Sequence, residues 1–112
     1  MTTEDPTAIV CIPEAIPAHA RAAHVRLAQA LFADAPIEAV DGTAEGYRLT
    51  LHVGALGDVA RWMTNERLCC PFLRFRVEVA PGSDALAVTL TGPQGTREFL
   101  DQRLLTLGGA AQ

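Results

Sequence analysis

The stretch E-R-L-C-C-P, residues 66–71, places two adjacent thiols at the point where a helix must end and a strand can begin. Proline lacks a backbone N–H and its ring clashes with the preceding turn, so Pro71 cannot continue a helix. Upstream, apolar residues at spacings of three, four and seven predict a helix over 56–70 whose apolar stripe consists of Leu56, Val59, Ala60, Met63 and Cys70. Two of the three cysteines are therefore expected at a helix-to-strand corner.

The segments on either side of this corner carry the periods of strands and helices. After the corner, the stretch 72–80 places Phe75, Val77 and Val79 opposite charged residues, which is typical of a strand with one buried face. Before the corner, the stretch 47–53 alternates in the same way. The other expected elements are a strand over 8–12, a helix over 17–32, strands over 37–40 and 86–90, and a final helix closed by Gly108-Gly109.

The first six of these elements follow the order strand, helix, strand, strand, helix, strand. That order predicts an α+β fold of the ferredoxin-like split βαβ type (βαββαβ), with an additional C-terminal strand and helix. We expect one domain over residues 8–107, between flexible termini at 1–7 and 108–112. Sheets of this kind have open edges, so the expected partner is a second copy, in a homodimer formed through a sheet edge.

Composition and charge argue against several classes of protein. A net charge of −4 and a pI near 5.2 differ from the basic balance of nucleic-acid-binding proteins, so no nucleic-acid partner is expected. The N-terminal M-T-T-E-D-P is acidic, unlike a signal peptide, and no apolar run approaches the ~18 residues of a membrane span. Three cysteines without a regular spacing do not suggest a disulfide framework. We therefore expect a cytoplasmic protein with reduced thiols and no membrane partner.

The expected topology brings all three cysteines together. In a ferredoxin-like sheet the first and fourth strands are antiparallel neighbours, which would place Cys11 beside Cys69 and Cys70. Three thiolates around one point suit a thiophilic ion such as Hg(II), As(III), Cu(I) or Zn(II). Structural zinc usually takes a fourth ligand, which His19 or His24 could supply.

Two charged residues are expected around these thiols. Glu66 lies three and four residues before the cysteine pair, on the same side of the expected helix, and either accepts a proton or pairs with an arginine. Arg67 is the arginine that we expect with it next to the site. No base–nucleophile pair stands out in the sequence, so an enzyme has the least support.

Two other interpretations of the cysteines stay open at this point. The vicinal pair could serve a thiol-redox protein, with Cys69 or Cys70 as the nucleophile. Free cysteine is also among the most often buried residue types, so the three thiols could be core residues of a non-enzymatic interaction module.

A resemblance to a known group of proteins favours the first interpretation. The stretches E-R-L-C-C-P-F-L-R-F (66–75), L-T-G-P-Q-G (90–95) and I-V-C-I-P-E (9–14) resemble small, largely uncharacterised bacterial proteins with an E-R-x-C-C-P-F signature. The resemblance covers residues 8 to about 105. Some members of the group are associated with MerR-type mercury-responsive regulators, which implies the handling of a thiophilic metal.

Overall fold

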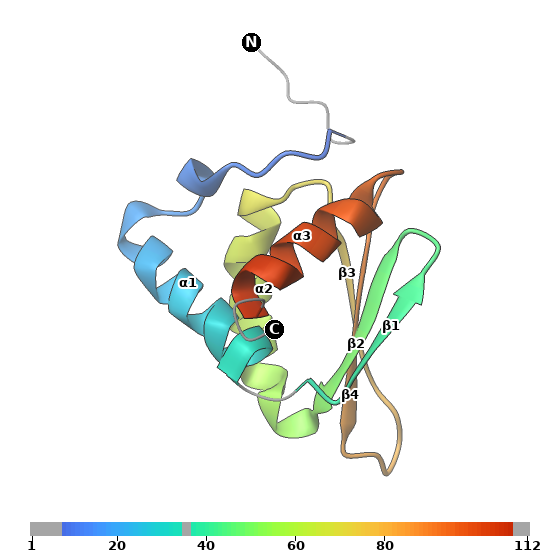
Figure 1. Cartoon of the computed structure of the whole chain (residues 1–112). Coiled ribbons are helices and arrows are strands. Elements are labelled where there is room, and N and C mark those ends of the chain that lie inside the picture. The colour runs from blue at the N-terminus through green and yellow to red at the C-terminus, as the bar shows by residue number, and fades with distance from the viewer. Residues whose placement is uncertain (1–7, 35–36, 109–112) are drawn as a thin grey trace.

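The computed structural model describes residues 8–34 and 37–108, which form one antiparallel sheet with helices packed on one of its faces (Figure 1). The sheet has the order β1-β2-β4-β3, formed by β1 (Ala39–Thr43), β2 (Gly46–His52), β3 (Arg74–Val79) and β4 (Ala85–Thr91). The helices are α1 (Arg21–Gln29), α2 (Leu56–Cys69) and α3 (Thr96–Gly108). Short 3-10 turns lie at Pro13–Ala15, Ala18–Ala20 and Val53–Ala55, and a π-helical turn at Ala30–Asp34 follows α1.

Alternating side chains explain the central strands. In β2, Leu49 and Leu51 are buried beneath the helices, whereas Arg48 and His52 are exposed, as the period of two predicts. The buried residues of β4, which pairs with both β2 and β3, lie beside them. The core therefore lies between one face of the sheet and the layer of helices, and the α+β class expected from the sequence is confirmed.

The expected ferredoxin-like strand order is not the observed one, because the segment 8–12 does not join the sheet. It runs past the C-terminal end of α2, where the Ile12 N–H donates to the Cys69 carbonyl at 2.7 Å. A short apolar run has the same pattern whether it pairs in a sheet or packs against helices, so periodicity could not separate the two. The termini expected to be flexible, 1–7 and 108–112, lie outside the described residues except for Gly108, which ends α3.

The buried stripe of α2 also differs from the expected one. Val59 and, at the C-cap, Cys70 are buried as predicted, but Leu56 is 40% exposed, and Trp62, Glu66 and Cys69 take the other interior positions. Trp62 sets this orientation, since its ring packs edge-on against Phe32 and Phe75, with centroids 4.8 and 5.6 Å away. The rotated stripe carries a carboxylate into the interior beside the last turn of the helix.

Within the described residues, no helix has the length and apolar character needed to cross a lipid bilayer.

Replacing Trp62 with alanine should lower the free energy of unfolding by about 3–5 kcal/mol, because it empties the space between the two aromatic rings that flank it. Urea denaturation followed by circular dichroism measures the change. Val25→Ala is the matched control, since Val25 is an exposed apolar residue of a neighbouring helix and its truncation should change stability by no more than about 0.5 kcal/mol. Equal losses for the two variants would contradict the buried position of Trp62.

Candidate metal centre

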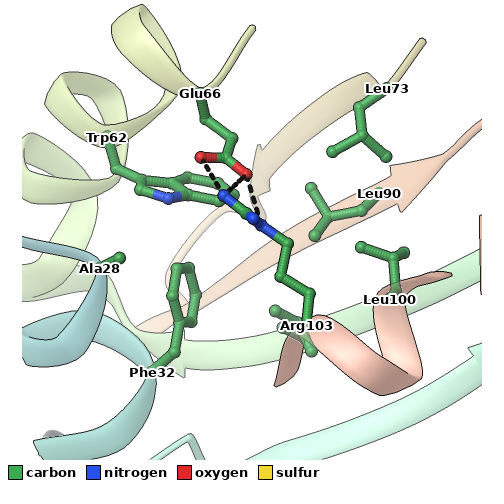
Figure 2. Close-up of a pocket in the computed structure, with 9 residues that line it drawn as sticks. Ala28, Phe32, Trp62, Glu66, Leu73, Leu90, Leu100 and Arg103 are labelled. Carbon is green, nitrogen blue, oxygen red and sulfur yellow. Dashed lines mark hydrogen bonds and ion pairs between the residues drawn. The ribbon is translucent and has the colours of Figure 1, made fainter. Parts of the chain in front are cut away.

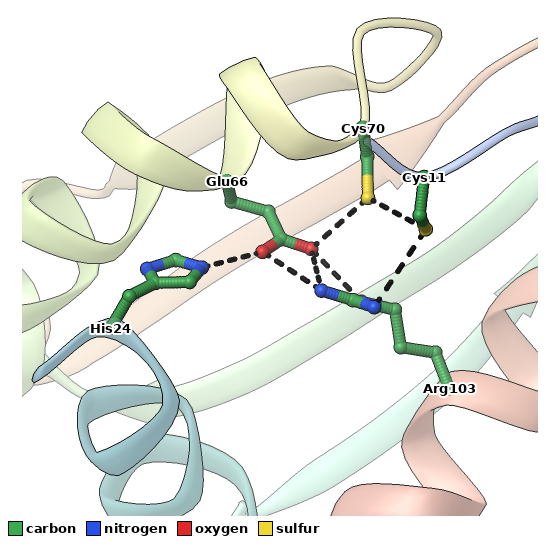
Figure 3. A network of polar contacts seen from close by, with 5 residues as sticks. All are labelled: Cys11, His24, Glu66, Cys70 and Arg103. Carbon is green, nitrogen blue, oxygen red and sulfur yellow. Dashed lines mark hydrogen bonds and ion pairs between the residues drawn. The ribbon is translucent and has the colours of Figure 1, made fainter. Parts of the chain in front are cut away.

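The three cysteines converge at one end of α2. Their Sγ atoms all lie within 4.8 Å of one another. Figure 3 shows two of them, those of Cys11 and Cys70, which are 3.4 Å apart. Cys69 and Cys70 are buried, whereas Cys11 is half-buried. The convergence expected from the sequence is therefore confirmed, although the chain reaches it by a different route.

Local backbone structure positions the thiols. Cys69 is the last residue of α2, and Cys70 is its C-cap residue, whose N–H donates to the Glu66 carbonyl at 2.8 Å. Pro71 prevents a further turn, so both thiols stay at the helix end. The hydrogen bond from Ile12 to Cys69 then holds the neighbouring Cys11 against this end. Two segments that are distant in the sequence thus supply one cluster, with Cys11 and Cys70 separated by 59 positions.

Glu66 is the polar centre of the site. Its side chain is 1% exposed and forms a bidentate ion pair with Arg103. The Nε atom of Arg103 donates to Oε2 at 3.0 Å, and its Nη2 atom donates to Oε1 at 3.1 Å. His24 contacts Oε1 through Nε2 at 2.9 Å. The Cys70 thiol donates to Oε2 at 3.5 Å, which connects the carboxylate directly to the sulfur cluster (Figure 3).

Arg103 occupies the position that the sequence analysis gave to Arg67. The Arg103 Nη1 atom also reaches the Cys11 sulfur at 3.8 Å, so one guanidinium contacts both the carboxylate and a thiol. Arg67 is exposed and lines a surface groove between α2 and β3. Arg103 was not predicted from the sequence. The sequence signal for it is its position three residues after Leu100, which places it on the same face of α3 as this buried residue.

The two histidines proposed as extra ligands lie in different surroundings. His19 is exposed in the turn before α1. His24 is buried and bonded to Glu66, and its Nδ1 atom is buried without a hydrogen-bond partner among the described residues. Among the described residues, the ligand atoms that lie within 4.8 Å of one another belong to the three cysteines, and neither histidine belongs to this group.

A small cavity adjoins the ion pair (Figure 2). Its volume is about 20 Å³, room for roughly one water molecule. Glu66 and Arg103 supply its polar wall, and apolar side chains that include Phe32, Trp62 and Leu100 supply the rest. The carboxylate and guanidinium therefore meet where little water competes, which strengthens their attraction.

Burial and charge keep the inner thiols protonated. Burial raises the pKa of the Cys70 thiol strongly, and the Glu66 carboxylate raises it further, while Arg103 acts in the opposite direction. Burial, and then the neighbouring Cys11 and Glu66, raise the pKa of Cys69 as well. For Arg103, burial would lower the pKa, but Glu66 and the cysteines outweigh it, so the guanidinium stays charged. Without an ion, Cys69 and Cys70 are thiols rather than thiolates at neutral pH.

The sulfur positions are close to those that one soft ion requires. Three thiolates bound about 2.3 Å from an ion stand about 3.8–4.0 Å from one another, for tetrahedral or trigonal angles. The observed cluster, with one sulfur pair at 3.4 Å and all pairs within 4.8 Å, needs small side-chain shifts to reach that geometry. Binding would replace the thiol protons, so it would release them to the solvent or to nearby bases.

Compared with known proteins, the chain matches no family model, no curated protein and no solved structure at a significant level.

Replacing Arg103 with alanine should lower the free energy of unfolding by about 3 kcal/mol, because the buried Glu66 carboxylate loses its bidentate partner. The value lies at the low end for buried pairs, since the Arg103 side chain is 31% exposed and water can replace part of the interaction. Arg67→Ala, which removes an exposed arginine, is the matched control and should cost no more than about 0.5 kcal/mol in urea denaturation. A larger loss for Arg67→Ala than for Arg103→Ala would contradict the assignment.

Iodoacetamide should alkylate Cys11 faster than Cys69 and Cys70 at neutral pH, because Cys11 is half-buried while the other two thiols are buried and have raised pKa values. Mass spectrometry of the digested protein measures the three rates. Equal alkylation rates for the three thiols would contradict this account.

The free energy of unfolding should fall as the pH rises above 9.0, the ordinary pKa of a cysteine thiol, because the folded chain holds the inner thiol protons more tightly than the unfolded chain. Cys70→Ala should flatten that decline, which urea denaturation at several pH values measures.

Proposed function

We propose that this protein binds or senses a thiophilic metal or metalloid ion through Cys11, Cys69 and Cys70. The observation that supports the proposal is the approach of three sulfur atoms to within 4.8 Å from two distant segments of the chain. Core packing alone does not require three thiols at one point beside a carboxylate and a guanidinium. Soft ions prefer thiolate ligands, and three of them form a sufficient coordination shell for several such ions.

The donor set favours some of the candidate ions over others. Zinc usually takes four ligands in structural sites, and His24, the nearer histidine candidate, is engaged by Glu66. Hg(II), As(III) and Cu(I) are the better candidates, because they accept a shell of two or three sulfurs. The resemblance to proteins associated with mercury-responsive regulators favours Hg(II) among these three.

Each residue of the site has a role in this proposal. Cys11 is the accessible thiol and makes the first contact with an incoming ion. The Cys70 thiol already donates to Glu66, so the proton that leaves it has an acceptor in place. The Arg103 guanidinium lies 3.8 Å from the Cys11 sulfur and offsets the negative charge of the thiolates that form. The activity is binding and not catalysis, in a reducing compartment such as the cytoplasm.

The reduced protein should retain one Hg(II), As(III) or Cu(I) ion per chain in native mass spectrometry, and should retain Zn(II) less firmly. The variant with all three cysteines changed to serine should retain none, while His19→Ala, which alters an exposed histidine, should bind like the original protein. Cys11→Ser should lower the affinity by more than about 10-fold, because it removes one of the three ligands. Competition with glutathione gives the affinities.

Loss of every ion to millimolar glutathione would contradict the proposal. In that case the cysteines would be buried core residues of an interaction module.

A thiol-redox function is the second candidate, and one observation favours it. The Cys11 and Cys70 sulfurs are 3.4 Å apart, so these two residues, rather than the vicinal pair, are placed to form a disulfide. The two thiols would give up two protons and two electrons to an oxidant such as the disulfide of a low-molecular-weight thiol. The raised pKa of Cys70 slows this reaction, so fast alkylation of Cys70 at neutral pH would favour redox chemistry over ion binding.

A further inference from the structure

The strand β3 is an open edge of the sheet. It lies at the end of the order β1-β2-β4-β3 and pairs with β4 on one side, which leaves the backbone groups on its other side directed outward. An edge strand of this kind can accept another strand unless charge, proline or a covering segment prevents it.

An apolar groove runs beside this edge, on the face of the sheet that carries the helices. It has a volume of about 360 Å³ between α2 and β3, and Leu56, Met63, Phe75 and Val77 supply much of its wall. Leu56 is 40% exposed, and Val79, at the end of the same strand, is 42% exposed. The strand edge and the groove together form one surface, which we call the β3 surface.

We propose that the β3 surface binds a second copy of this chain, through antiparallel pairing of the two β3 strands about a two-fold axis at Val77. The paired strands would join two four-stranded sheets into one sheet of eight strands. This proposal is independent of ion binding at the cysteine cluster.

Two of the three charged residues of β3, Arg76 and Glu78, are self-complementary in this register. With Val77 opposite Val77 of the second copy, Arg76 lies opposite Glu78 of the second copy, and the symmetry repeats the pair. On the other face, Phe75 lies opposite Val79 of the second copy, next to the two grooves. Polar pairs and apolar pairs therefore form on separate faces of the joined sheet.

The neighbouring register is unfavourable. Moving the axis to Arg76 would place the Arg76 guanidiniums of the two copies directly opposite each other, and like charges at that position repel. Registers with an axis between two residues would pair inward-directed backbone groups with outward-directed ones. Of the registers centred on Arg76 and Val77, charge thus favours the one centred on Val77.

The pairing leaves existing contacts of the sheet intact. The cross-strand neighbours of Arg76 and Glu78 on β4 are Thr89 and Ala87, which carry no charge. Among the residues that the structure describes, neither Arg76 nor Glu78 forms an ion pair within one copy. A two-fold axis perpendicular to the sheet also keeps both layers of helices on the same face, so the groove of each copy faces that of the other.

The test uses charge reversal on the full chain, with molecular mass measured by light scattering after size-exclusion chromatography. The original protein should be a dimer. Arg76→Glu and Glu78→Arg should each weaken dimerisation by at least about 10-fold, because each places like charges opposite each other. The double variant Arg76→Glu/Glu78→Arg should be a dimer again, because the pairs are restored with reversed sign.

Mixing the two single variants gives a second readout that does not depend on either one alone. In the Arg76→Glu chain positions 76 and 78 both carry carboxylates, and in the Glu78→Arg chain both carry guanidiniums, so an equimolar mixture should form a heterodimer. Asp41→Arg, a charge reversal on the opposite edge strand β1, is the matched control and should leave the dimer unchanged. Far-ultraviolet circular dichroism checks that each variant is folded.

A monomeric original protein at high micromolar concentration would overturn the proposal. A dimer that both single variants leave unchanged would also overturn it, as would a dimer that Asp41→Arg disrupts.

Discussion

The ion pair between Glu66 and Arg103 is the interaction on which the rest of the site depends. A carboxylate that is 1% exposed is tolerated in a protein interior only where charge and hydrogen bonds replace its water. Arg103 supplies the charge from α3, and His24 supplies a further contact from α1. Because Glu66 itself belongs to α2, one carboxylate connects all three helices and fixes their arrangement over the sheet.

The same carboxylate determines the state of the sulfur cluster. Its negative charge, added to burial, holds the inner thiols in their protonated form, so they resist oxidation and alkylation while no ion is bound. A soft ion changes this balance, because its own charge stabilises thiolates at the same positions. The arrangement thus combines low thiol reactivity with three sulfur atoms within 4.8 Å of one another, a combination that favours the proposed ion binding over redox chemistry.

The first segment of the chain has a different role from the one that its pattern indicates. The residues 8–12 are apolar and β-branched like a buried strand, yet they pack against the end of α2 through the hydrogen bond of Ile12. The expected pairing of first and fourth strands was wrong, although the convergence of cysteines inferred from it was right. Both arrangements bring the end of this segment to the helix-to-strand corner, and that corner depends on Pro71.

Local patterns by themselves determined the strands β2 and β3, the end of α2 at a proline and the placement of two thiols there, because period and ring sterics act over a few residues. Only the tertiary structure decided which side of α2 is buried and which cation meets Glu66. Trp62 selects the buried side through rings on two other elements, and Arg103 reaches Glu66 across 37 residues. Such partners are selected by packing in three dimensions. The spacing of Arg103 from Leu100 indicates which helical face Arg103 shares, but not which carboxylate it contacts.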